Sequence, residues 1–117
     1  MLFDSTIFFT RDLDRIVAFY RDELGFEFEY LLANRFASFT FANDVHLGIK
    51  VPTEEREVPG HQTIFISVPD PAGLEQAFKD KGIPISHPLR DQDWATNFAI
   101  LDPDGNKVLF CRKSRFG

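Results

Sequence analysis

The same order of structural elements occurs twice along this chain, and that duplication constrains the fold more than any other feature. In each half, an apolar β-prone segment precedes a helical pattern, and three further β-prone segments follow. The halves correspond at an offset of roughly 58 residues, although few residues are identical. Both halves therefore predict the order β-α-β-β-β.

The residues that begin and end the two predicted helices are equivalent. Asp12 and Asp70 each stand before a helical pattern, where their carboxylates can accept backbone hydrogen bonds. Pro71 suits the first turn of the second helix. Gly25 and Gly82 are natural C-terminal stops. The expected strands are residues 5–9, 26–31, 36–42, 45–51, 62–68, 83–87, 94–101 and 107–112.

One half alone is too short to bury both its helix and its sheet, because small chains bury a low fraction of their surface. We therefore expect one domain over residues 1–117, with module one at about 3–51 and module two at about 62–112. The expected fold class is α+β, with two βαβββ modules in tandem.

Charge and cysteine content exclude several classes of protein. The 18 acidic residues outnumber the 13 basic ones, giving a net charge of −5, so a nucleic-acid partner is not expected. No apolar run approaches the ~20 residues that span a bilayer, so we expect no membrane association. The N-terminus lacks the features of a signal peptide. The single cysteine, Cys111, cannot form an intrachain disulfide, so the expected location is the cytoplasm.

Two groups of motifs resemble a known superfamily. The opening motifs are Asp12-Leu13-Asp14-Arg15, Ala18-Phe19-Tyr20-Arg21-Asp22 and Leu24-Gly25-Phe26, and the last hairpin is Asp102-Pro103-Asp104-Gly105-Asn106. Together they resemble the vicinal oxygen chelate superfamily, which contains glyoxalase I, bleomycin-resistance proteins and extradiol dioxygenases. The resemblance covers residues 5–112. It implies curled mixed sheets around a cleft, helices on the outside, and a homodimer.

The resemblance also implies where a metal would be held in metal-dependent members. Those four ligand positions fall here on Ser5, on or near Gly48, on Thr63 and on Leu109. None is a usual ligand for a divalent metal, because zinc, nickel and iron need imidazole, carboxylate or thiolate donors. We therefore expect no metal and no other cofactor. The alternative is a displaced divalent-metal site that uses His46 and His61.

Side chains alternate along a strand, so the expected register decides which ones face the cleft. In strand 45–51 this alternation assigns His46 to the cleft, and in strand 62–68 it assigns Phe65. Phe9 is assigned there from the first strand. Continuing the alternation through the Asn43-Asp44 turn and the Asp102–Gly105 turn adds aromatic residues from the neighbouring strands. Arg35 and Lys107 are added as candidate polar contacts to the ligand. The candidate ligand-binding residues are Phe9, Arg35, Phe39, Phe41, His46, Phe65, Trp94, Phe98 and Lys107.

An apolar, aromatic cleft is costly unless a ligand or a partner covers it. The favoured function is a small-molecule binding protein of the bleomycin-resistance type, which sequesters an apolar or aromatic ligand in a metal-free cleft. Arg35, His46 and Lys107 would orient a polar or anionic group on that ligand. No catalytic residue is assigned, and whether the protein is an enzyme stays open. One alternative is a glyoxalase-like lyase, isomerase or dioxygenase using His46 and His61. Another is an assembly module whose aromatic face is a dimer interface. A further alternative is that the aromatic side chains only fill a collapsed core.

Overall fold

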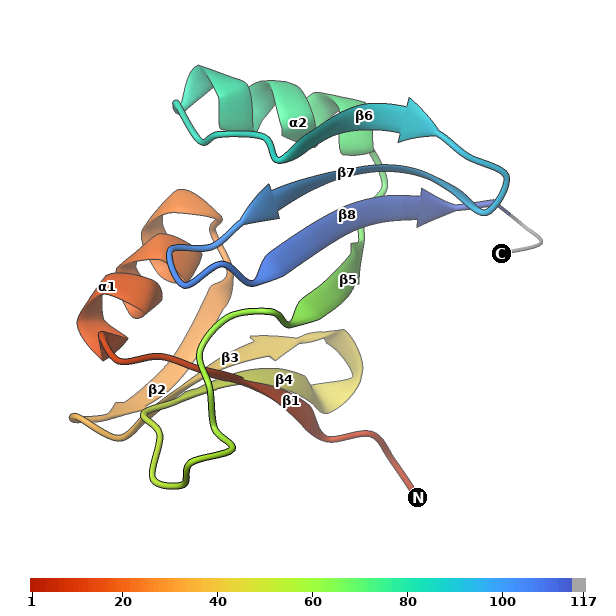
Figure 1. The fold of residues 1–117 in the computed structure, drawn as a ribbon. Helices are drawn as coiled ribbons and strands as arrows, with labels where there is room; N and C mark the ends of the chain where they lie inside the picture. The colour runs from red at the N-terminus through yellow and green to blue at the C-terminus, as the bar shows by residue number, and fades with distance from the viewer. Residues whose placement is uncertain (115–117) are drawn as a thin grey trace. The chain divides into compact units, whose positions relative to one another are not determined.

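Each half of the chain forms one βαβββ module, as the duplication predicts. The computed structural model describes residues 1–114 (Figure 1). Their contacts divide the chain into two compact units, with the boundary in the sequence between Gly60 and His61. The expectation of a single domain stays a prediction.

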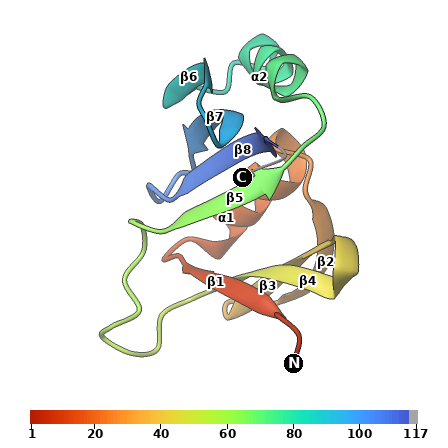
Figure 2. The ribbon, with the colours of Figure 1, turned by 90° about the vertical axis from the view of Figure 1, so that its right-hand side faces the viewer.

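The first module contains a four-stranded mixed sheet. Its strands lie in the order β1-β4-β3-β2, with β1 parallel to β4 and the other pairs antiparallel. Figure 2 shows β1 and β4 side by side. The elements are β1 (Ser5–Phe9), α1 (Leu13–Ala18) with a π-helical turn at Phe19–Glu23, β2 (Glu27–Leu32), β3 (Phe36–Phe41) and β4 (Val45–Lys50).

The second module repeats this topology. Its strands lie in the order β5-β8-β7-β6, and β5 runs parallel to β8. The elements are β5 (Thr63–Ser67), α2 (Pro71–Asp80), β6 (His87–Asp91), β7 (Ala95–Leu101) and β8 (Lys107–Lys113). Within residues 1–114, no helix has the length and apolar character needed to cross a membrane.

Both predicted helix starts are confirmed. The Asp12 carboxylate accepts a hydrogen bond from the Arg15 backbone N–H at 3.3 Å, and the Asp70 carboxylate accepts one from the Gly73 N–H at 3.1 Å. Pro71 occupies the first turn of α2. These contacts satisfy backbone donors that have no partner inside a helix.

The end of α2 explains the one strand whose predicted position is wrong. Gly82 adopts a φ of +78°, its N–H bonds the Lys79 carbonyl at 3.0 Å, and the Ile83 N–H bonds the Phe78 carbonyl at 2.9 Å. This is a Schellman cap, in which the apolar residue after the glycine packs back on the helix. Ile83 therefore belongs to the helix end, and the strand expected at 83–87 begins only at His87.

One face of each sheet packs on the helix of its own module. In the first module the Tyr20 ring lies 6.4 Å from Phe8 and 5.9 Å from Phe39, centroid to centroid. In the second, Phe78 of α2 lies 5.9 Å from Phe98 and 5.3 Å from Phe110. We call the opposite face of each sheet its distal face.

The predicted cleft positions of Phe39 and Phe41 are wrong. The connection from β3 to β4 contains three residues, 42–44, because Phe41 pairs with Val45 and Phe39 with Leu47. The prediction assumed a two-residue turn. A slip of one residue moves every side chain of a strand to the other face. Phe39 and Phe41 therefore lie on the helix-packed face.

Phe98 is misplaced by the same kind of error. Leu101 pairs with Lys107, so five residues connect β7 to β8, whereas the prediction counted four. The Asp102 carboxylate holds this turn by accepting from the N–H groups of Asp104 and Asn106, each at 2.9 Å. Asn106 is thus part of the turn. Phe98 consequently pairs with Phe110 in the core.

Candidate functional site

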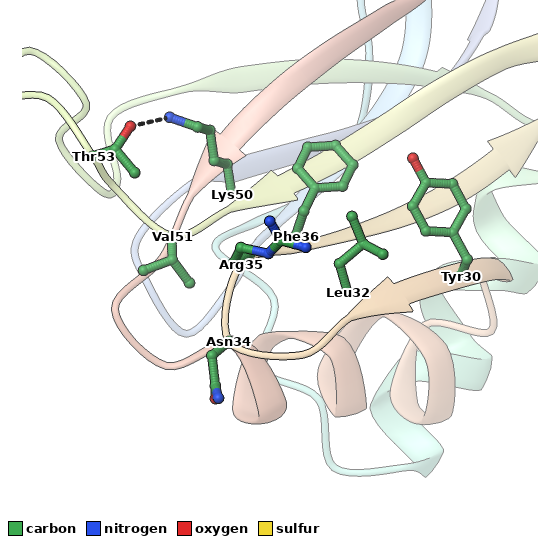
Figure 3. Close-up of a pocket in the computed structure, with 8 residues that line it drawn as sticks. All are labelled: Tyr30, Leu32, Asn34, Arg35, Phe36, Lys50, Val51 and Thr53. Carbon is green, nitrogen blue, oxygen red and sulfur yellow. Dashed lines mark hydrogen bonds between the residues drawn. The ribbon is translucent and has the colours of Figure 1, made fainter.

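The distal face of the first sheet carries a pocket of about 460 Å³ (Figure 3). It lies between the β2–β3 turn and the segment that follows β4. Its volume falls in the range of small-molecule sites, which is about 300–1,000 Å³. The lining residues are Tyr30, Leu32, Asn34, Arg35, Phe36, Lys50, Val51 and Thr53.

A smaller cavity of about 220 Å³ adjoins this pocket, since Tyr30 and Phe36 line both. Its polar residues differ in charge from those of the larger pocket, because the cavity contains two carboxylates and a histidine. The lining residues are Asp4, Ser5, Glu29, Tyr30, Phe36, Ser38, His46 and Gly48.

The rings of Tyr30 and Phe36 stack between the two hollows. Their centroids are 6.2 Å apart and their planes differ by 28°. Both residues are brought to the distal face by strand pairing, Tyr30 opposite Ser38 and Phe36 opposite Lys50. Stacked aromatic rings at a pocket wall offer flat apolar surface to a ligand.

The absent side chain of Gly48 makes room for Phe36. A Cβ atom at Gly48 would lie 2.6 Å from both Phe36 Cζ and Ile7 Cδ1. The position where the resemblance expects a metal ligand is therefore filled by apolar atoms of two other residues.

The other three expected metal positions also do not fit a divalent ion. Ser5 shares the cavity with Gly48, and its hydroxyl is a weak neutral donor. In the second module, Thr63 and Leu109 lie on the distal face of the sheet, and Leu109 has no donor atom. Among residues 1–114, no three His, Cys, Asp or Glu side chains are grouped so as to hold a metal ion.

His46 lies on the distal face, as predicted, and is held by three oxygen atoms. Its Nδ1 lies 3.3 Å from the Asp4 carbonyl oxygen, and its Nε2 lies 3.4 Å from Glu29 Oε2 and 3.3 Å from Asp44 Oδ1. His61 belongs to the second unit and has a φ of +64°. The pairing of His46 with His61 stays an untested alternative, because the two residues belong to different compact units.

Lys50 reaches the pocket but its charge is compensated. Its ammonium bonds both carboxylate oxygens of Glu57, one of them at 2.7 Å, and the Thr53 hydroxyl at 2.8 Å. The Glu57 carboxylate also accepts from the Thr53 N–H at 2.8 Å and is only 5% exposed. The bond from Lys50, followed by the backbone bond, lowers the pKa of Glu57 to about 2. Glu57 is therefore ionised at neutral pH.

Arg35 differs from Lys50 because its charge is not compensated. Its backbone is held at both sides, by the bond from its N–H to the Leu32 carbonyl at 3.0 Å and from the Val51 N–H to its carbonyl at 2.9 Å. Its side chain is exposed, and within residues 1–114 no carboxylate forms an ion pair with it.

The distal face of the second sheet holds a second aromatic pair. Phe65 and Trp94 stack with centroids 5.4 Å apart and planes 22° apart. Trp94 packs on a buried apolar cluster that includes Ala95 and Cys111, while Phe65 is 56% exposed. Phe65 is therefore on the predicted face.

Phe9 and Lys107 also lie on the distal faces, because Phe9 pairs with Lys50 and Lys107 with Thr63. Tyr30, Leu32 and Phe36 line the pocket although the sequence did not point to them. The signal for these three residues was the alternation of apolar residues in β2 and β3. Assigning that alternation to a face of the sheet requires the correct hairpin register.

His87 is a second polar centre that the sequence did not indicate. Its Nε2 lies 3.0 Å from the side-chain oxygen of Asn97, which is fully buried. The pKa of His87 lies below its usual value, mainly because burial disfavours the charged imidazolium. His87 is therefore part of the packing of β6 on β7.

Tandem βαβββ modules with mixed sheets define a protein of the vicinal oxygen chelate fold. A sequence-family model described as the Glyoxalase/Bleomycin resistance protein/Dioxygenase superfamily matches residues 2–110, and the chain belongs to this superfamily. No curated protein sequence matches it significantly.

Solved structures of similar fold include both a binding protein and an enzyme. An antibiotic-binding protein, TnmS3 from a Streptomyces species, aligns with a TM-score of 0.84 and 17% identity, over 97% of each chain. Lactoylglutathione lyase from Agrobacterium tumefaciens aligns with a TM-score of 0.79 and 22% identity, over 95% of this chain and 92% of that one. A superfamily member from Sphaerobacter thermophilus aligns with a TM-score of 0.81 and 20% identity, over 96% and 97%. At these identities the likeness shows the fold.

Proposed function

We propose that this protein binds and sequesters an apolar or aromatic small molecule without a metal or other cofactor, in the manner of bleomycin-resistance proteins. The observation that carries the proposal is the aromatic pocket lined by Phe36, whose ring also fills the space that a metal-ligating side chain at position 48 would need. A site built in this way supplies apolar contact and no Lewis acid.

The wall of the pocket supports an aromatic ligand. Tyr30 and Leu32 are each 45% exposed, so flat apolar surface is accessible to a molecule entering from solvent. The stacked pair of Phe65 and Trp94 offers similar surface on the second module, and we assign it to ligand contact as well. Similarity in fold to an antibiotic-binding protein agrees with this assignment.

The proposal also includes the cellular setting. We place the protein in the cytoplasm, because its one cysteine, Cys111, is a buried free thiol. Its partners in this proposal are the ligand and a second copy of the chain.

The test is calorimetric titration with naphthalene-2-methanol, an uncharged planar probe. We expect binding that Leu32→Ala weakens about threefold to tenfold, because truncating an apolar contact costs about 1 kcal/mol. Leu31→Ala is the matched control: Leu31 is 43% exposed, close to the 45% of Leu32, but pairs with Ala37 on the other face of the same strand.

Equal weakening by both substitutions would contradict the assignment of the site to the distal face. Absence of binding at millimolar concentrations of this probe and of its charged analogues would contradict the function itself. Chemical conversion of a bound molecule by the purified protein would favour the enzyme alternative.

A further inference from the structure

We infer that the ligand of the first-module pocket carries a negative charge, and that Arg35 binds it. The ligand class is a planar aromatic monoanion, such as an aromatic carboxylate or sulfonate, with its ring system against Tyr30 and Phe36. This inference rests on the proposed function and adds the charge and orientation of the ligand.

The charge of the pocket is opposite to that of the whole chain. The chain has a net charge of −5, yet the lining contains Arg35 and Lys50. None of the lining residues, all of which lie in the described range 1–114, carries a carboxylate. A local excess of positive charge on an acidic protein favours anionic ligands at this place.

The two cations have different roles. The Lys50 ammonium already bonds Glu57 and Thr53, so its donors are used inside the protein. Glu57 is ionised at neutral pH and cancels this charge. Arg35 is therefore the lining residue that has both a full positive charge and unused donors, because no carboxylate of residues 1–114 pairs with it.

Arg35 is positioned as well as charged. The hydrogen bonds of its backbone to Leu32 and Val51 join it to two other residues that line the pocket. Figure 3 shows Arg35 at the centre of the lining, between Val51 and Phe36, whereas Asn34 points away from the rings. A guanidinium group binds a carboxylate or sulfonate through two parallel hydrogen bonds, which sets the orientation of the ligand.

The adjoining cavity limits how far the negative charge can extend. Glu29 and Asp4 line it, and the Glu29 carboxylate accepts a hydrogen bond from the Ser38 hydroxyl at 2.7 Å. A second anionic group that passed the Tyr30–Phe36 pair would meet these carboxylates. The arrangement therefore favours a ligand whose only negative charge is at the Arg35 end.

The experiment compares three probes with the same ring system: naphthalene-2-carboxylate, naphthalene-2-methanol and naphthalen-2-ylmethylammonium. Calorimetric titration of the full chain gives the three dissociation constants. We expect the carboxylate to bind at least about tenfold more tightly than the alcohol, because a hydrogen-bonded charge pair contributes about 1.5–3 kcal/mol. The ammonium probe is expected to bind more weakly than the alcohol.

Three variants locate the effect. Arg35→Gln is expected to remove the preference for the carboxylate over the alcohol, so that the two dissociation constants become similar. Arg35→Lys keeps the charge without the paired donors and is expected to retain part of the preference. Arg11→Gln, which removes an exposed arginine outside the lining, is the matched control and is expected to behave as the wild type.

The outcomes separate this inference from the function on which it rests. If all three probes bind equally, or if Arg35→Gln leaves the carboxylate preference intact, the inference is wrong and the proposed function stands. If none of the three binds, the proposed function fails and the inference fails with it.

Discussion

At the scale of single residues, Gly48 and Phe36 decide the character of the site. Gly48 lies on the distal face of β4, and the Phe36 ring from β3 occupies the space above it. A larger residue at position 48 would displace that ring, and with it the wall against which Tyr30 stacks. The missing metal ligand and the aromatic pocket are thus two aspects of one packing arrangement.

This packing predicts that Gly48→Ala destabilises the protein by about 1–3 kcal/mol, the usual cost of overpacking. The cause is the 2.6 Å approach of the new Cβ to Phe36 Cζ and Ile7 Cδ1. The free energy of unfolding, measured with denaturant, checks this. Phe36→Leu made in the Gly48→Ala background is expected to recover part of the loss, and purely additive effects would contradict the assigned contact.

Glu57 predicts a pH dependence of stability. Its pKa is lowered from 4.5 to about 2 in the folded protein, so folding favours the ionised carboxylate. The stabilising contribution is therefore present in full above about pH 4.5 and is lost as the pH falls toward about 2.

Measuring the free energy of unfolding between about pH 2 and pH 6 tests this dependence. The stability difference between wild type and Glu57→Gln is expected to be constant at the upper end and to shrink in acid. Glu55→Gln, which removes an exposed carboxylate from the same loop, controls for the change in net charge. A difference that does not vary with pH would show that Glu57 acts without its charge.

At the scale of elements, the hairpin connections decide which aromatic residues are available to a ligand. Turns of three and five residues replace the expected two and four, and each shift turns a whole strand over. Phe39 and Phe98 occupy equivalent places in the two modules, on the central strands β3 and β7, and both are fully buried against their helices.

The corrected register predicts a ranking of truncations. Phe39→Ala and Phe98→Ala are expected to cost about 3–5 kcal/mol each, because they leave cavities in the core. Phe65→Ala is expected to cost about 1 kcal/mol or less, since that ring is 56% exposed and mainly stacks on Trp94.

Chemical denaturation of the three variants gives the ranking of their unfolding free energies. If Phe39→Ala does not fold, Phe39→Leu takes its place in the comparison. The register would be contradicted if Phe65→Ala proved as costly as the two core truncations.

At the scale of the whole molecule, the duplication produces two modules with the same topology but different distal faces. The first has a charged, aromatic pocket, and the second has the Phe65–Trp94 pair over a buried apolar cluster. Since both faces expose aromatic rings, we propose that a second copy of the chain covers part of this surface. Light scattering is expected to give twice 13.5 kDa, and a monomer at micromolar concentration would contradict the homodimer.

The metal-dependent alternative is also tested on the whole molecule. We expect titration with Zn²⁺, Ni²⁺ and Fe²⁺ to show no stoichiometric binding that depends on His46 and His61, because the four expected ligand positions lack suitable donors. The variants for this test are His46→Ala and His61→Ala. Stoichiometric binding lost in both variants would overturn the metal-free proposal. Thermal denaturation with and without a chelator gives an independent readout.

The amino-acid sequence by itself determined the two βαβββ modules, the helix starts at Asp12 and Asp70, the superfamily, and the unsuitable residues at the metal positions. These depend on local patterns and on residue identity, which can be read without coordinates. Only the tertiary structure decided which faces Phe39, Phe41 and Phe98 occupy, and that Tyr30, Phe36 and Arg35 meet at one pocket. The physical reason is that side chains alternate along a strand with a period of two. One residue more or fewer in a turn therefore exchanges the two faces of the strand, and only the strand pairing shows how many residues each turn contains.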